Sequence, residues 1–167
     1  MGYEEHKHLS PQKVNCAVLV ISDSRTEKTD ESGKLLVDGL TGAGHSISFF
    51  ALLKNDSEAI QEKLGELLHT QDVQAIITSG GTGASKMDLT IETVLPMLEK
   101  KLDGFGELFR YLTYQEIGSG SILSRAAAGV ALGKIIICLP GSLKAVKLAL
   151  EKIILPEIGH MVREASR

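Results

Sequence analysis

The sequence predicts a single α/β domain with a mostly parallel sheet, and three observations support this fold class. The chain has 167 residues, the length of one domain, and 43% of them are hydrophobic, as in a folded globular protein. Near-continuous apolar runs, such as VNCAVLVI at Val14–Ile21, are typical of strands covered on both faces. Segments with helical spacing lie between these runs, and such alternation favours parallel βαβ units.

The predicted elements alternate in chain order. Strands are expected at Val14–Ile21, Ile47–Leu53, Val73–Thr78 and Ile135–Leu139. Helices are expected at Glu31–Leu40, from an N-cap at Ser57 onward, and from near Leu143 until Pro156 interrupts or ends the pattern. Gly104–Thr113 is expected to be a turn into a short helix, and Leu123–Ala131 a further helix.

The chain ends and the composition bound the function classes. Residues 1–12 are polar and are expected to form a flexible tail, which leaves 13–167 as the single domain. The start does not resemble a secretory signal, and no apolar run approaches the ~20 residues of a membrane helix. Two cysteines inside strand-like runs favour reduced thiols, so a cytoplasmic protein is expected. The net charge of −3 gives no basic surplus for nucleic-acid binding.

The motif with the clearest chemistry is SGGTG at Ser79–Gly83, directly after a predicted strand. Consecutive glycines let backbone N–H groups of Gly80, Gly81, Thr82 and Gly83 point into one concavity and bind an anion. The motif matches neither the dinucleotide pattern nor the phosphate-binding loop that ends in Lys-Ser/Thr. A tight connector without a ligand is about equally compatible with the glycines alone.

Two aspartates near the ends of predicted strands each have two interpretations. Asp88 follows Gly83 by five residues, and a carboxylate beside an anion site indicates a metal or cation between the two. The alternative is that Asp88 caps the helix that carries Thr90, which the spacing alone favours. Asp56 lies just before a predicted helix and has the same two interpretations.

Small or polar residues follow the other strands. Because the carboxyl ends of parallel strands share one sheet edge, the residues that follow the other strands are expected to lie near the glycine motif: Ser22, Asp23, Ser24, Asn55, Asp56, Pro140, Gly141 and Ser142. Arg125, next to Ser124, has the geometry to bind phosphate or carboxylate, or to form a structural ion pair. No arrangement of a protein nucleophile stands out.

In combination, the sequence motifs of this chain are typical of one protein family. VISDS at Val20–Ser24, TSGGTG at Thr78–Gly83 with Asp88 and Thr90, GFGELFR at Gly104–Arg110, ILSRA at Ile122–Ala126 and LPGS at Leu139–Ser142 occur in the family's order. The chain thus resembles the MoaB/MogA family of molybdenum cofactor biosynthesis proteins, which includes the gephyrin G domain, and is most similar to its MoaB branch. The resemblance covers nearly the whole chain after residue 12.

The resemblance implies a three-layer α/β/α fold, trimers or hexamers, and a defined reaction. In that reaction the terminal phosphate of molybdopterin attacks the α-phosphorus of Mg-ATP, pyrophosphate leaves, and adenylylated molybdopterin forms for molybdenum or tungsten insertion. No protein nucleophile is required, since the acceptor phosphate is already anionic. The metal-insertion protein of the same pathway is the implied partner. The alternative is a non-catalytic molybdopterin-binding or assembly protein.

Carried over by motif, the resemblance implies catalytic roles for Asp56 and Asp88, with Mg²⁺ held at Asp88. It implies substrate contacts from Ser22, Asp23, Ser79, Gly80, Gly81, Thr82, Gly83, Ser124, Arg125, Pro140, Gly141 and Ser142. The chain departs from the family pattern at Ile91, where proline is common, and at Met87, where arginine is common. A missing arginine weakens contact with one phosphate unless Lys86 replaces it.

Overall fold

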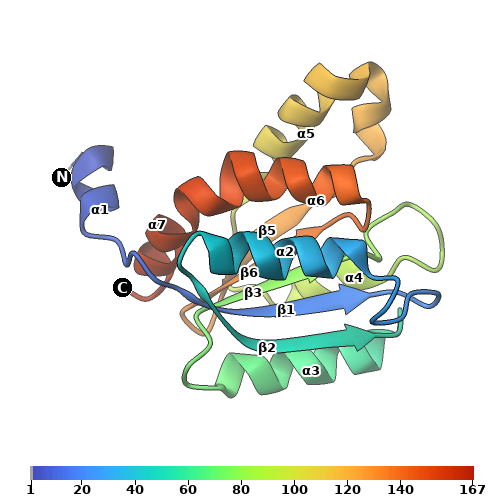
Figure 1. The fold of residues 1–167 in the computed structure, drawn as a ribbon, viewed down its shortest axis with the longest axis horizontal. Coiled ribbons are helices and arrows are strands. Elements are labelled where there is room, and N and C mark those ends of the chain that lie inside the picture. Colours follow the sequence, from blue (N-terminus) through green and yellow to red (C-terminus); the bar gives the residue numbers. More distant parts are fainter. Residues whose placement is uncertain (1) are drawn as a thin grey trace.

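A computed structural model describes residues 2–167 as a six-stranded sheet between layers of helices (Figure 1). The strand order is β2-β1-β3-β6-β5-β4. The first four strands are parallel, β5 pairs antiparallel with β6, and β4 pairs antiparallel with β5. The predicted α/β class with a mostly parallel sheet is therefore confirmed. The strands are β1 (Asn15–Ile21), β2 (Ser46–Leu53), β3 (Ala75–Ser79), β4 (Lys100–Lys101), β5 (Ala127–Ala131) and β6 (Lys134–Leu139).

Helices cover both faces of the sheet. On one face lie α2 (Glu31–Gly42), α6 (Leu143–Ala149) and α7 (Leu155–Ala165), and on the other lie α3 (Ser57–His69) and the short α4 (Thr90–Val94) (Figure 1). Successive side chains of β1 pack alternately into the cores on the two faces of the sheet. Cys16 and Val18 belong to the core under α2, whereas Ala17 and Leu19 belong to the core over α3. The three-layer arrangement is confirmed.

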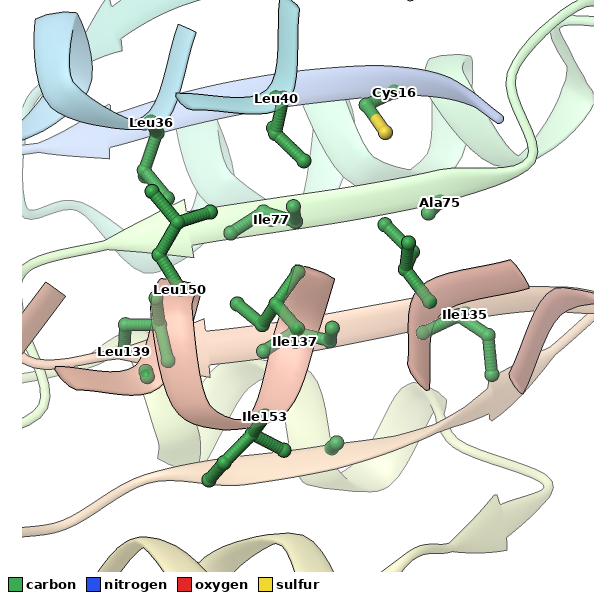
Figure 2. Packing of buried hydrophobic residues seen from close by; sticks show 14 of the residues in the cluster. Cys16, Leu36, Leu40, Ala75, Ile77, Ile135, Ile137, Leu139, Leu150 and Ile153 are labelled. Atoms are coloured by element: carbon green, nitrogen blue, oxygen red, sulfur yellow. The ribbon is translucent and has the colours of Figure 1, made fainter. Parts of the chain in front are cut away.

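The core under α2 is the larger of the two. Figure 2 shows Leu36 and Leu40 of α2 above the strands that carry Ile77 and Ile137, with Leu150 beside them. All five side chains are buried. With both faces of β1, β3 and β6 covered in this way, the loops at their carboxyl ends are the places where polar groups reach a solvent-facing edge.

The helix predicted at Leu123–Ala131 is wrong. Its first residue ends a 3₁₀ segment, η2 (Gly118–Leu123), and its last five residues form β5, paired with β6. The alanines of this run have high helix propensity, but strand pairing overrides it. Gly129 permits the close pairing of β5 with β4 on the other side, because a Cβ there would lie 2.4 Å from the Lys100 carbonyl oxygen.

Of the turn into a short helix predicted at Gly104–Thr113, the helix is confirmed and the turn is wrong. The whole range lies within the 15-residue helix α5 (Asp103–Ile117), which Phe105 and Phe109 anchor in the core. Pro156 interrupts the C-terminal pattern without ending it. A π-helical turn, η3 (Leu150–Ile154), leads into α7, and Pro156 lies in the first turn of α7, where its missing N–H is least costly. A further 3₁₀ turn, η1 (Leu95–Met97), follows α4.

The segment expected to be a flexible tail contains a helix, α1 (Tyr3–His8), which packs against α7. The hydroxyl of Tyr3 and the ammonium of Lys7 donate hydrogen bonds to Glu157 Oε1, at 2.6 and 2.8 Å. Burial acts to raise the pKa of Glu157, but the hydrogen bonds from Lys7, Tyr3 and His160 outweigh it and hold that pKa below its usual value. Among residues 2–167, no helix has the length and apolar character needed to cross a membrane.

Both cysteines are free and buried, on opposite faces of the sheet. Burial raises the pKa of the Cys16 and Cys138 thiols to about 12. Because the thiolate is the reactive form, we expect neither cysteine of the folded protein to react with a disulfide reagent at pH 8, and both to react after unfolding in guanidinium. Rapid labelling of one thiol in the folded protein would contradict this placement.

Candidate functional site

The loops that follow β1, β2, β3 and β6 converge on a pocket of about 550 Å³, here called the sheet-edge pocket. This volume falls in the range of small-molecule sites. All but two of the residues predicted for the site line it. They are Ser22, Asp23, Gly80, Gly81, Thr82, Gly83, Asp88, Ser124, Arg125, Pro140, Gly141 and Ser142. Ser79 is fully buried at the end of β3, beside Pro140, and Asp56 lies elsewhere.

The loop that follows β3, Gly80–Gly83, is here called the glycine loop. Hydrogen bonds to its backbone carbonyl groups hold it in place. Thr90 donates from its hydroxyl to the Gly80 carbonyl at 2.8 Å and from its backbone N–H to the Gly81 carbonyl at 2.9 Å. Arg125 donates to the Gly83 carbonyl at 2.8 Å. Gly80 and Gly81 have φ angles of 106° and 66°, a backbone region that glycine adopts without strain.

The amide groups of the same loop are left available. In the described part of the chain, the N–H groups of residues 81–84 donate no hydrogen bond. They follow two residues in the left-handed region, at the carboxyl end of a buried strand. Consecutive N–H groups in such a turn form an anion-binding concavity. This arrangement favours an anion site over a connector without a ligand.

Asp88 faces this loop and does not cap a helix. Its Oδ2 accepts hydrogen bonds from the Ser85 N–H at 3.1 Å and the Ser85 hydroxyl at 2.7 Å. Helix α4 has Leu89 at its N-cap, with no side-chain cap, so the capping alternative for Asp88 is wrong. A Cβ at position 83 would lie 2.5 Å from Asp88 Oδ2, which shows how closely the carboxylate approaches Gly83.

Asp56, in contrast to Asp88, does cap a helix. Its side chain accepts a hydrogen bond from the Ala59 N–H at 2.8 Å, so Asp56, and not Ser57, is the N-cap of α3. The Ser57 hydroxyl instead contacts the Thr93 hydroxyl at 2.7 Å. The residue of this loop that lines the sheet-edge pocket is Asn55. The capping interpretation of Asp56 is therefore confirmed, and its catalytic role stays a prediction.

Substitution of Asp56 tests its capping role through the stability of the protein. We expect Asp56→Ala to lower the free energy of unfolding by about 1 kcal/mol, because it removes the acceptor for the Ala59 N–H. Asp56→Asn should leave stability nearly unchanged, since asparagine is an equally good N-cap. Urea unfolding of the three proteins measures both effects. Equal destabilisation by Asn and Ala would contradict the capping role.

Sequence reasoning missed Arg25, which lines the pocket and ties two of its loops together. Its guanidinium donates to the Gly141 carbonyl at 2.7 Å and to the Ser32 hydroxyl at 2.5 Å. It also lies 3.8 Å from the buried carboxylate of Asp30, which caps α2. The position of Arg25, directly after the VISDS strand end, was the sequence feature that could have identified it.

The pocket carries charges of both signs. Asp23 and Asp88 line it together with Arg25 and Arg125, and Arg125 also pairs with Glu92. Among the described residues, no three His, Cys, Asp or Glu side chains are grouped as a metal site. One or two carboxylates fit Mg²⁺ that arrives with substrate phosphates, because Mg²⁺ is commonly held that way. Lys86 and Met87 are exposed and do not line the pocket.

A second cavity, of about 350 Å³, adjoins the sheet-edge pocket through Arg125. The charged residues that line it are Lys101, Asp103, Glu107 and Arg110, beside Gly106. The GFGELFR motif thus borders this second cavity and lies outside the sheet-edge pocket.

Comparison with known proteins agrees with this geometry. Residues 17–160 match the family described as "Probable molybdopterin binding domain". The molybdenum cofactor biosynthesis protein B of Bacillus cereus is 46% identical over 168 residues, covering 100% of this chain and 99% of the relative. The chain belongs to the MoaB/MogA family. The matched range contains every loop of the sheet-edge pocket.

Solved structures of MoaB proteins share the fold. A crystal structure of a molybdenum cofactor biosynthesis protein B has 46% identity and a TM-score of 0.90, and covers 93% of this chain and 98% of that one. The tungsten cofactor synthesizing protein MoaB from Pyrococcus furiosus has 32% identity and a TM-score of 0.85. That comparison covers 95% of this chain and 100% of the other.

Proposed function

We propose that this MoaB-family chain acts in molybdenum or tungsten cofactor biosynthesis as a molybdopterin adenylyltransferase. The observation that carries the proposal is the row of unbonded N–H groups at residues 81–84 with the carboxylate of Asp88 beside it. Such a row suits phosphate oxygens, and the carboxylate suits the metal that accompanies ATP. The names of the relatives in molybdenum and tungsten cofactor synthesis support the choice of substrate.

The chemistry asks the protein mainly to position two anions. The terminal phosphate of molybdopterin attacks the α-phosphorus of ATP, and the bond to the pyrophosphate leaving group breaks. The N–H groups of residues 81–84 orient the phosphates, while Arg25 and Arg125 place positive charge at the pocket wall. Asp88 would hold Mg²⁺, which supplies charge neutralisation for the phosphates when bound.

One observation favours the alternative of a non-catalytic molybdopterin-binding protein. Of the two carboxylates that the resemblance implies for catalysis, Asp88 lines the sheet-edge pocket, whereas Asp56 caps α3. From the same loop, the uncharged Asn55 lines the pocket. The site retains its phosphate-facing amides in either case, so both functions share molybdopterin binding.

Turnover separates the two functions. Purified protein is mixed with molybdopterin and Mg-ATP, and both pyrophosphate and adenylylated molybdopterin are followed. The adenylyltransferase proposal predicts that the two products form in equal amounts. It also predicts that each product exceeds the protein concentration. Tight molybdopterin binding without pyrophosphate release would contradict it and would assign the chain to the binding class.

We also propose that the chain assembles with copies of itself, as a trimer or a hexamer. Exposed apolar residues on α5 and η2 support this, and Figure 1 shows α5 extending away from the sheet. These residues are Leu108, Tyr111, Tyr114, Ile117, Ile122 and Leu123. Sedimentation of the native chain beside Tyr111→Glu tests this surface: a smaller assembly for the variant is expected, and an unchanged one would contradict it.

Interaction with a metal-insertion protein and a cytoplasmic location stay predictions.

A further inference from the structure

The side chain of Asn55 holds the segment that carries Asp88 from both sides. Its Nδ2 donates to the Met87 carbonyl, and its Oδ1 accepts from the Leu89 N–H at 3.3 Å. One amide therefore joins the residues directly before and directly after Asp88. In the described chain, no other side chain bonds to either of these two backbone groups.

Asn55 is itself fixed in place. Its backbone N–H donates to Asp23 Oδ1 at 3.0 Å, which links it to the loop after β1. On its other side it lies against the glycine loop, where a Cβ at position 81 would come within 2.9 Å of Asn55 Oδ1. The amide thus stands between three loops of the sheet-edge pocket, on a backbone that continues into the capped start of α3.

The contacts require an amide specifically. The Met87 carbonyl needs a donor and the Leu89 N–H needs an acceptor, and asparagine presents one of each on adjacent atoms. A carboxylate of the same shape keeps the acceptor but places a second oxygen against the Met87 carbonyl. Alanine removes both bonds and leaves residues 84–88 held by contacts within their own turn, such as Asp88 N–H to the Ser85 carbonyl.

We propose that Asn55 is a positioning residue that sets the carboxylate of Asp88 against the glycine loop, so that metal and phosphate are bound together. The metal part of this inference rests on the proposed function, whereas the positioning part does not. Without the two bonds, the Asp88 segment samples other positions, and metal-dependent nucleotide affinity falls. Affinity for ATP without metal is unchanged, because the N–H groups of residues 81–84 remain.

Hydrogen exchange of the ligand-free protein tests the positioning directly. Asn55→Ala should increase the exchange rate of the Leu89 N–H at least tenfold. Asn55→Asp should increase it by a smaller factor, because it keeps the oxygen acceptor but loses the donor to the Met87 carbonyl. Glu58→Ala, an exposed position in the first turn of α3, is the control and should change nothing. Unchanged Leu89 exchange in Asn55→Ala would overturn the inference.

Metal binding distinguishes positioning from general destabilisation. Mn²⁺ replaces Mg²⁺, and its affinity for the ATP complex is followed by electron paramagnetic resonance in the native chain and in Asn55→Ala. We expect at least a tenfold loss of Mn²⁺ affinity, with metal-free ATP affinity within twofold. An equal loss of both affinities would overturn the inference. Faster Leu89 exchange in Asn55→Ala, with no metal-dependent ATP binding by the native chain, would support the positioning role and contradict the proposed function.

Discussion

Asp88→Asn is expected to lower the rate of adenylylated molybdopterin formation by about 10²–10³-fold, or roughly 3–4 kcal/mol of transition-state stabilisation. Asparagine retains the shape of the side chain and an oxygen to accept from Ser85, so the loop should keep its conformation. What the substitution removes is the negative charge that would hold Mg²⁺ beside the glycine loop. The measurement is the initial rate of pyrophosphate release at saturating substrates.

Asp38→Asn is the matched control, because it makes the same charge change at an exposed position of α2. It should leave the rate within twofold of the native chain. Thermal unfolding of both variants checks that the fold is retained. A rate for Asp88→Asn within threefold of the native rate would remove Asp88 from the metal site.

Gly80→Ala is expected to destabilise the protein by at least about 2 kcal/mol. The φ angle at Gly80 is 106°, and an added Cβ would lie 2.1 Å from the backbone oxygen of Ile21. That oxygen belongs to the central strand β1 and cannot move away as a flexible side chain could. Relief would require the glycine loop to leave the sheet edge, so nucleotide binding should be lost as well.

At Gly65, by contrast, substitution by alanine should stabilise the protein. Gly65 lies within α3, and a Cβ there meets no atom within 4 Å. Gly65→Ala is therefore expected to stabilise the protein by about 0.5–1 kcal/mol through helix propensity. Urea unfolding of both variants gives the comparison. If Gly80→Ala were as stable as the native chain, the close approach of the glycine loop to β1 would be wrong.

The sequence predicted the central strands and the edge at which the site lies, because buried parallel strands have an unmistakable apolar pattern. It placed Asn55 and Asp56 together at this edge, after β2, but did not determine which of the two lines the pocket. Asn55 and Asp56 are adjacent, both are polar, and a helix begins immediately afterwards. Which of the two caps the helix depends on the backbone conformation at the cap, which residue types alone do not determine.

The other differences have similar causes. The alanines of Ala127–Ala131 form a strand because they pair with β6, which begins just beyond the turn at Leu132 and Gly133, and with the short β4 on the other side. Arg25 acts through a contact with Gly141, which lies more than a hundred positions further along the chain. A contact across so many positions leaves no periodic pattern in the sequence. The positions of such residues follow from the fold and not from local propensity.

In the proposed function, the backbone N–H groups of residues 81–84 bind the phosphates of the nucleotide. Amide chemical shifts of the ¹⁵N-labelled native chain, followed during titration with Mg-ATP, test it most directly. We predict that the largest shift changes occur at the amides of Gly81, Thr82, Gly83 and Ala84. Unchanged amides there, with the largest changes around Lys101 and Arg110, would place the nucleotide in the neighbouring cavity and contradict the claim.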